Sequence, residues 1–325
     1  MARTGEPTGA TGGAASEGVV PAAAVAVAIA AVGVLALRYR RDLNSARARL
    51  DTVDRRAIAT EFGTLEYAEH GTGDPVLVSH GIFHGCDGGL FSTRDVVVDR
   101  RVVSPSRFGY LGSTLPAGAT GADQADAFVV LLDHLQIDKT DVIGLSAGTG
   151  AAVQLALRHP DRVEHLVIIS GNWPGSPTAT APPGWAKIFY SDPAMWTLKA
   201  FVPKLIRRLM GVPKGFPRDA EDSRRVDEWL NSFFPFGPRA EGAIFDAFIS
   251  NPEINGCSLE DLRVPTLLLH TKDDLLATYD AAERAAKRIP GSVMISLDSG
   301  GHLVLGQTDR VRAEVASFLV ASAQA

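Results

Sequence analysis

The sequence predicts a doubly wound α/β fold with a mostly parallel sheet, a helical cap insertion and an N-terminal membrane-anchor helix. Three observations lead to this prediction. From about residue 57, short apolar runs alternate with amphipathic helical patterns, which is typical of strands and helices that alternate along a chain. The interval 171–262 interrupts this alternation without a strand pattern. An uncharged apolar run over 19–37 precedes the whole pattern.

The N-terminal region is expected to anchor the chain. Residues 1–18 are rich in Gly, Ala, Thr and Ser, and we expect them to be disordered. As a helix, the run 19–37 would be roughly 28 Å long, close to the hydrocarbon thickness of a bilayer. A secretory signal peptide carries positive charge before its apolar run, whereas here the charge follows, at Arg38, Arg40 and Arg41. This bias predicts an uncleaved single-pass anchor with the following domain in the cytoplasm.

Two further interpretations concern the same region. Alanine is only weakly apolar and Pro21 lies within the run, so the alternative is a marginal or unused span. Residues 38–56 mix Arg and Asp at helical spacing, and we interpret them as a solvated juxtamembrane linker.

Composition excludes several function classes. The net charge is −5 and the folded region has no basic block, which argues against a nucleic-acid partner. Cys86 and Cys257 lie far apart, match no metal-ligand spacing, and are expected to be free thiols, with a single disulfide as the alternative. No Cys/His cluster suggests zinc, so neither a metal nor a cofactor is expected.

The expected elements follow in chain order. Residues 64–69 alternate like an edge strand. Short apolar runs at 75–79, 101–104, 141–144, 163–169, 265–269 and 293–297 predict buried parallel strands. Helical periodicity follows at 127–135, 147–158, 281–289 and 310–319, and Thr120 with Asp123 resembles a capping box. We therefore expect an α/β core over 57–170 and 263–325, with 171–262 as a helical cap.

The motif Gly144-Leu145-Ser146-Ala147-Gly148 lies between a predicted strand and a predicted helix. Gly-x-Ser-x-Gly in this context is the signature of a nucleophile elbow. The chain turns so tightly there that only small residues fit beside the serine, whose hydroxyl then lies above the sheet. Ser146 is therefore the candidate nucleophile.

A serine nucleophile needs a base, which is usually a histidine oriented by a carboxylate. In this fold the chain order is Ser, then Asp or Glu, then His. His302 follows Gly300 and Gly301 in a turn after the strand 293–297, which makes it the candidate base. Three other downstream histidines are better explained as structural: His159, His165 and His270. For the acid, the loop after 265–269 offers Asp273 and Asp274, and the residues alone leave both open.

Acyl transfer also needs hydrogen-bond donors for the developing oxyanion. The amide of Ala147, directly after the nucleophile, is one candidate. The glycine-containing loop after 75–79 supplies the other, with Ile82 the better candidate and Phe83 the second. We also expect Phe83 to line the substrate pocket, and leave open whether His84 does so or is an ordinary loop residue.

The interval 171–262 is rich in aromatic residues. We expect an aromatic helical insertion at the carboxyl edge of a parallel sheet to roof a ligand site. The alternative is that these side chains form the insertion's own core. Besides Phe83, the candidates for the substrate pocket are Trp185, Phe189, Trp196, Phe233 and Phe234. A short amphipathic helix is expected over 203–210.

From about residue 60 onward the chain resembles the α/β-hydrolase superfamily, in its serine-esterase, peroxidase-like and proline-iminopeptidase-like branch. The resemblance rests on motifs in a shared order: His80-Gly81, Ser106-Arg107-Phe108-Gly109-Tyr110-Leu111-Gly112-Ser113, the Gly144–Gly148 elbow, Arg158-His159-Pro160, 264–274, and Gly301-His302. It implies Ser146 as nucleophile and His302 as base.

The same resemblance bears on the acid and on the reaction. The family often places its acid three residues past a glycine, and Thr271 occupies that position here, which selects Asp274. The missing glycine leaves Asp273 open. Relatives with a dehalogenase or epoxide-hydrolase mechanism carry aspartate at the elbow, so Ser146 argues against both.

The expected activity is a cofactor-free serine hydrolase acting on an ester, lactone, thioester or small amide through an acyl-enzyme. A carboxylic ester of a small-molecule acyl substrate is the leading expectation. Two alternatives remain: a non-catalytic ligand-binding or signalling module of the same fold, and an acyltransferase.

Overall fold

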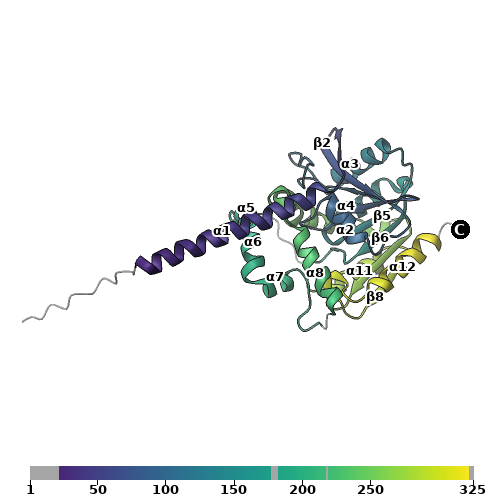
Figure 1. Ribbon diagram of the computed structural model, residues 1–325. Coiled ribbons are helices and arrows are strands. Elements are labelled where there is room, and N and C mark those ends of the chain that lie inside the picture. Colours follow the sequence, from purple (N-terminus) through teal and green to yellow (C-terminus); the bar gives the residue numbers. More distant parts are fainter. Residues whose placement is uncertain (1–21, 177–181, 217–218, 322–325) are drawn as a thin grey trace, which may run out of the picture. The chain divides into compact units, whose positions relative to one another are not determined.

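The computed structural model describes residues 22–176, 182–216 and 219–321. The predicted disorder of 1–18 and the first residues of the predicted span therefore lie outside the described residues. The chain divides into two compact units, Met1–Asp42 and Leu43–Ala325. Figure 1 shows the strands and most of the helices gathered in the second unit.

The second unit is built on an eight-stranded sheet in the order β1-β2-β4-β3-β5-β6-β7-β8. Strands β3 to β8 are mutually parallel, whereas β2 runs antiparallel to both β1 and β4. The strands are β1 (Arg55–Thr60), β2 (Gly63–His70), β3 (Pro75–Ser79), β4 (Arg101–Pro105), β5 (Thr140–Leu145), β6 (Val163–Ile169), β7 (Thr266–Thr271) and β8 (Val293–Leu297).

The prediction of residues 64–69 as an edge strand is wrong in one respect. These residues lie in β2, which has a partner on each side, and β1 is the edge. The pattern did not reveal β1 because Ile58 is its single buried side chain, so the strand has almost no apolar alternation.

Helices cover both faces of the sheet, as a doubly wound fold requires. Alternate strand residues separate the two sides: Leu77 and Val142 belong to one apolar cluster, whereas Val76 and Ile143 belong to the other. The first face is covered by α3 (Gly121–His134), α4 (Thr149–Arg158) and α11 (Tyr279–Arg288). The second is covered by α2 (Cys86–Thr93) and α12 (Thr308–Ala321). The capping box of Thr120 and Asp123 begins α3 as predicted.

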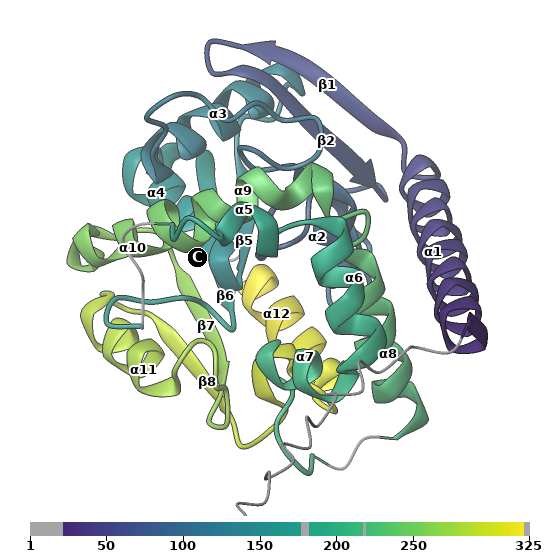
Figure 2. The ribbon, with the colours of Figure 1, turned by 90° about the vertical axis from the view of Figure 1, so that its left-hand side faces the viewer.

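Between β6 and β7 the described residues contain helices and turns but no strand. The α-helices are α5 (Ala186–Phe189), α6 (Asp192–Phe201), α7 (Pro203–Leu209), α8 (Ala220–Ser232), α9 (Ala240–Phe245) and α10 (Asn251–Glu253). Figure 2 shows α5 to α8 on one side of the unit. Trp173, although it lies in this interval, is buried in the cluster beneath α4 and belongs to the core.

Helix α1 (Ala22–Asp51) is long and apolar enough over Ala23–Asp51 to cross a membrane, by length and composition. Its last two turns correct the prediction of a solvated linker over 38–56. Leu43, Ala46 and Leu50 are buried, and their spacing of three and four residues places them on one face of the helix. This part of α1 is therefore packed into the second unit rather than solvated.

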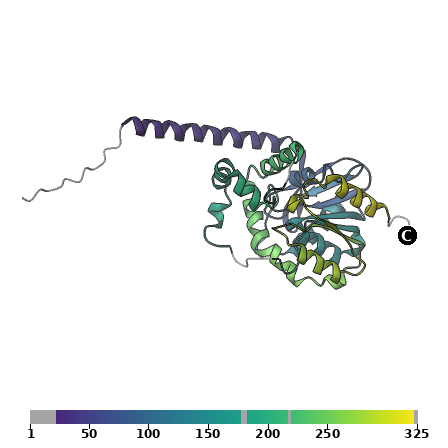
Figure 3. The same ribbon diagram turned by 90° about the horizontal axis from the view of Figure 1, so that it is seen from below.

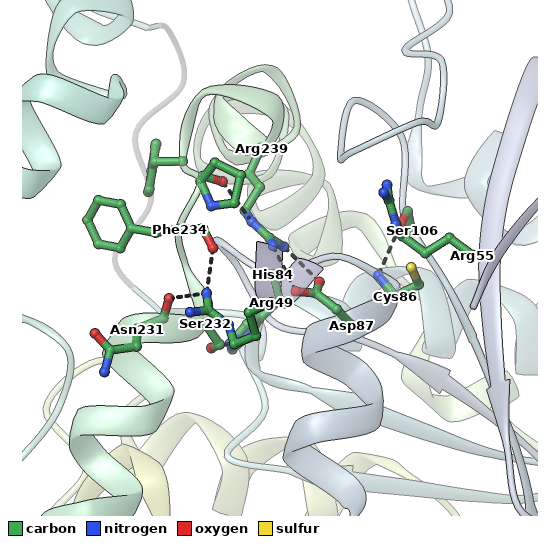
Figure 4. Close-up of polar contacts among 12 residues, drawn as sticks. Arg49, Arg55, His84, Cys86, Asp87, Ser106, Asn231, Ser232, Phe234 and Arg239 are labelled. Atoms are coloured by element: carbon green, nitrogen blue, oxygen red, sulfur yellow. Dashed lines mark hydrogen bonds and ion pairs between the residues drawn. The ribbon is translucent and has the colours of Figure 1, made fainter. Parts of the chain in front are cut away.

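The end of α1 is also held by hydrogen bonds (Figure 4). The guanidinium of Arg49 donates to the carbonyl oxygens of Asn231, in the last turn of α8, and of Phe234, just after it, each at 2.6 Å. Beside it, buried Arg239 forms a two-bond ion pair with Asp87 of α2, both bonds being 2.8 Å. These contacts tie the segment after α8 to α1 and α2.

Candidate active site

The turn at the end of β5 places Ser146 in a left-handed backbone conformation, with φ near +50°. Such a conformation is strained for any residue other than glycine and persists only where the surrounding structure imposes it. Two glycines make that possible. A Cβ on Gly144 would lie 2.6 Å from Ile168 Cδ1, and one on Gly148 would lie 2.1 Å from the carbonyl oxygen of Ser79. The spacing of the elbow motif thus follows from the close approach of β3 and β6 to this turn.

Three predicted residues form one hydrogen-bonded chain. Ser146 Oγ lies 2.8 Å from His302 Nε2, and His302 Nδ1 lies 2.8 Å from Asp274 Oδ2. The Asp274 carboxylate accepts a hydrogen bond from Nδ1–H of His302, which leaves Nε2 as the acceptor for the serine hydroxyl. The residues come from the ends of β5, β7 and β8, which meet at the carboxyl edge of the sheet.

Asp274 is buried, and both of its carboxylate oxygens accept hydrogen bonds. Its Oδ1 accepts hydrogen bonds from the amides of Leu276 and Ala277, at 2.8 and 3.1 Å. Burial raises the pKa of the Asp274 carboxyl, but the charges and hydrogen bonds of His302 and His270 outweigh it, and the pKa lies well below its usual range. Asp274 is therefore ionised at neutral pH.

Asp273 faces the turn that carries the histidine rather than the imidazole itself. Its carboxylate accepts hydrogen bonds from the amides of Gly300 and Gly301, at 3.3 and 2.8 Å. The hydroxyl of Thr271 donates to the carbonyl of Gly301 at 2.9 Å. Of the two adjacent carboxylates, it is Asp274 that the structure brings to His302.

The two candidate oxyanion donors, Ile82 and Ala147, both line the cavity beside Ser146. Within the described chain, the amide of Ile82 makes no hydrogen bond.

A buried network holds the loop that carries Ile82. The Arg107 side chain donates from Nε to the carbonyl of His80 at 2.9 Å, and its backbone amide donates to His80 Nε2 at 3.0 Å. The His80 proton is therefore on Nδ1, from which it is donated to the carbonyl of Gly81 at 2.8 Å. Arg107 is in turn ion-paired with buried Asp246, which also accepts from the hydroxyl of Tyr110.

The role of Asp246 was missed in the sequence, although Arg107 and Tyr110 belong to one of the quoted motifs. Asp246 lies in a turn of π-helix after α9, a context with no motif of its own. A single acidic residue among Phe245, Ala247 and Phe248 was the available signal, since an acid in an apolar run indicates a buried partner.

A cavity of about 350 Å³ opens beside Ser146 and His302. It extends between α2, α8 and the start of α12, where Phe91, Trp229 and Val311 contribute to its wall. Of the predicted pocket residues, Phe83 lines this cavity.

The other predicted pocket residues do not line it, which corrects the sequence prediction for Trp185, Phe189, Trp196, Phe233 and Phe234. Trp185 and Phe189 lie on the surface, with 59% and 37% of each residue exposed. Trp196 and Phe234 are buried within the helical region. Phe233 packs behind the wall, with its ring centroid 5.4 Å from that of Phe83. The alternative reading, that cap aromatics form their own core, holds for these buried rings.

Two further histidines on the loop after β3, His80 and His84, are buried and uncharged. His84 donates from Nε2 to Ser232 Oγ at 3.0 Å, because the Ser232 hydroxyl already donates to the carbonyl of Trp229. Burial lowers the pKa of His84 to about 3 and that of His80 well below its usual value. Among the described residues, no group of three or more His, Cys, Asp or Glu side chains could hold a metal ion. Cys86 and Cys257 are buried and free.

The buried histidines predict acid sensitivity. Between about pH 6.5 and pH 3 the unfolded chain binds protons at His80 and His84 that the folded chain does not, so the free energy of unfolding falls as the pH is lowered. Each histidine contributes a slope of up to about 1.4 kcal/mol per pH unit. Urea unfolding followed by circular dichroism from pH 8 to pH 5 measures this slope. His84→Gln should reduce it, whereas the exposed control His134→Gln should not, and equal slopes for all three proteins would contradict the assignment.

Comparison with known proteins gives concordant matches. A family model for the alpha/beta hydrolase fold matches residues 70–308. The uncharacterized hydrolase YcgS of Bacillus subtilis is 29% identical over 265 residues, which cover 76% of this chain and 91% of that protein. A pimeloyl-acyl-carrier-protein methyl ester esterase of Aromatoleum aromaticum is 31% identical over 215 residues, covering 62% of this chain and 80% of that protein.

Among solved structures, an alpha/beta hydrolase fold protein from Nakamurella multipartita matches with a TM-score of 0.68 and 26% identity. The match covers 83% of this chain and 100% of that chain. The family model spans more than half of the sequence, and the sheet order and the turn at Ser146 lie within it. This chain therefore belongs to the α/β-hydrolase fold family, and its similarity to hydrolases and esterases supports a hydrolase activity.

Proposed function

We propose that this protein is a serine hydrolase that cleaves an ester, lactone, thioester or small amide through an acyl-enzyme intermediate, with a carboxylic ester as the leading substrate class. The observation that carries the proposal is the unbroken chain from Ser146 Oγ through His302 to buried Asp274, with both links at 2.8 Å, beside a cavity of about 350 Å³.

In the first step, Ser146 Oγ attacks the carbonyl carbon of the substrate while His302 Nε2 takes the hydroxyl proton. The imidazolium that forms is stabilised by ionised Asp274, which its two backbone donors and its low pKa keep deprotonated. The negative charge that develops on the carbonyl oxygen is bound by the amides of Ile82 and Ala147.

In the second step, His302 returns its proton to the leaving alcohol, thiol or amine, and the acyl group remains on Ser146. A water molecule, deprotonated by His302, then attacks the acyl carbon, and His302 returns that proton to Ser146 Oγ as the bond to the acyl group breaks and the acid is released. Transfer to another acceptor uses the same two steps with an alcohol or amine in place of water.

The cavity wall favours an apolar acyl or aryl group. Phe91, Trp229 and Val311 provide carbon surface on one side, and Phe83 lies next to the loop that carries the oxyanion donors. Burial of apolar area against such a wall favours binding by about 25 cal/mol per Å². A small-molecule acyl substrate is thus the expected partner.

We further propose that α1 anchors the protein as a single-pass membrane span, with the catalytic unit on the cytoplasmic side. The support is the length and composition of the helix together with the arginines that follow its apolar part.

Reaction with a fluorophosphonate probe tests the catalytic assignment. Wild-type protein should be labelled, and Ser146→Ala should not be. His302→Ala and Asp274→Asn should lower the labelling rate by about 10³-fold or more, because the serine loses its base or the base loses its orientation. Asp273→Asn is the matched control, and it should stay within about tenfold of wild type because it removes hydrogen bonds only to the glycine turn.

Two outcomes would contradict this assignment. A folded wild-type protein that stays unlabelled would exclude the serine-hydrolase mechanism. A larger loss in Asp273→Asn than in Asp274→Asn would exclude the assigned acid. A product that changes when alcohol or amine acceptors are added would instead identify an acyltransferase.

Deletion of residues 1–41 tests the anchor. The shortened protein should move from the membrane fraction to the soluble fraction after cell lysis and ultracentrifugation, because it loses the apolar part of α1. A full-length protein that is already soluble would contradict the proposal.

A further inference from the structure

The helical region between β6 and β7 exposes an apolar surface that the proposed chemistry does not use. We define the cap face as the exposed apolar side chains of α5, α7 and the end of α6: Trp185, Ile188, Phe189, Phe201, Leu205 and Leu209. The exposed fraction reaches 74% for Ile188 and 57% for Phe201. Elsewhere in the second unit, exposed large apolar residues include Val98 and Val293, which lie singly in the sequence, and the pair Leu275 and Leu276.

The helices that carry the cap face pack against one another. Helix α5 packs on α6, and α6 packs on α7, while the rings of Trp185 and Phe189 meet edge to face at 5.7 Å. Figures 2 and 3 show the three helices together on one side of the sheet. A patch of this kind on a soluble domain marks an interaction surface rather than ordinary surface variation.

The chain segment that carries this face has a strongly positive net charge. Residues 182–216 contain six basic side chains and one acidic side chain, Asp192, for a net charge of +5 in a chain whose total is −5. The basic residues are Lys187, Lys199, Lys204, Arg207, Arg208 and Lys214. Arg207 is ion-paired with Asp227. The segment is thus opposite in sign to the protein as a whole.

We propose that the cap face docks on the surface of an anionic lipid bilayer. Exposed Trp, Phe, Ile and Leu side chains flanked by Lys and Arg are the composition of helices that lie in the membrane interface. The apolar side chains would enter the boundary between headgroups and acyl chains, and the basic residues would contact anionic headgroups. In a symmetric dimer this face would meet the same positive face of a second copy, so the surplus of positive charge selects an anionic lipid surface instead.

The same surface adjoins the mouth of the cavity. Leu209 and Leu276 both line the cavity and remain 48% and 40% exposed, so the cavity reaches the surface beside α7. The segment after α7 also touches the catalytic turn, because the carbonyl of Gly211 accepts a hydrogen bond from the His302 amide at 3.1 Å. Docking would therefore open the cavity toward lipid and favour acyl substrates that partition into the bilayer. This last step rests on the proposed function, whereas docking does not.

Trp185 reports docking directly. The full-length protein is reconstituted into phosphatidylcholine vesicles with or without phosphatidylglycerol, each containing a brominated lipid that quenches tryptophan. The difference between wild type and Trp185→Phe isolates Trp185 from the other three tryptophans, and the predicted span contains none. We expect Trp185 quenching to be at least twofold greater with phosphatidylglycerol, and to fall as salt is added because salt screens exposed charges.

Charge-reversal variants provide the matched comparison. Lys187→Glu, Lys204→Glu and Arg208→Glu together should reduce the quenching to its value in phosphatidylcholine alone. The control combines Lys139→Glu, Arg263→Glu and Lys287→Glu, which change the net charge equally on exposed sites outside the cap face, and it should keep the wild-type quenching. Ser146→Ala should also keep it, so a failure of the catalytic assignment leaves this result intact.

Quenching that is equal in both kinds of vesicle, or equal in the two triple variants, would overturn the proposal. A dimer in detergent would also overturn it, if Trp185 is shielded from aqueous iodide in that dimer and Ile188→Ser dissociates it. The cap face would then join two copies of the chain. If the quenching depends on phosphatidylglycerol but the fluorophosphonate probe does not label the protein, the docking proposal stands and the serine-hydrolase proposal fails.

Discussion

The close approach of the elbow turn to the backbone of β3 is the constraint on which the site depends. Gly148 lies so near the carbonyl oxygens of Ser79 and His80 that no side chain fits between them. This contact holds Ser146 in its left-handed conformation and also places the loop after β3 beside it. One packing requirement therefore positions both the proposed nucleophile and the amide of Ile82, and a side chain at position 148 would separate them.

Residues outside the site hold the two loops that carry its functional groups. Arg107, which is ion-paired with Asp246, holds the loop of His80 by a hydrogen bond to the His80 carbonyl. Asp273 holds the glycine turn that carries His302 by accepting a hydrogen bond from the amide of Gly301. Gly211 brings the segment after α7 onto the same turn. The helical region is consequently part of the site's support as well as its cover, because the segment after α7 contacts the turn that carries His302.

The sequence predicted the parts of this arrangement that depend on local backbone geometry. Ser146 and His302 were identifiable because each needs glycines that are visible in the chain. Asp274 was separable from Asp273 only by analogy, since the choice depends on how the ends of β7 and β8 meet. Phe83 was predicted correctly, but the aromatic residues between β6 and β7 were wrongly assigned to the pocket. Their burial against neighbouring rings, as for Phe233, or their exposure, as for Trp185, is set by helix packing that composition does not encode.

The central claim is that Ser146 carries the acyl group between the two halves of the reaction. Acid-quenched mass spectrometry of the protein during turnover of a 4-nitrophenyl ester tests it most directly. The account predicts an adduct of the mass of the acyl group on the peptide that contains Ser146, present in wild type and absent in Ser146→Ala. Turnover by the wild-type protein with no adduct on that peptide would contradict the claim. So would hydrolysis by Ser146→Ala at the wild-type rate.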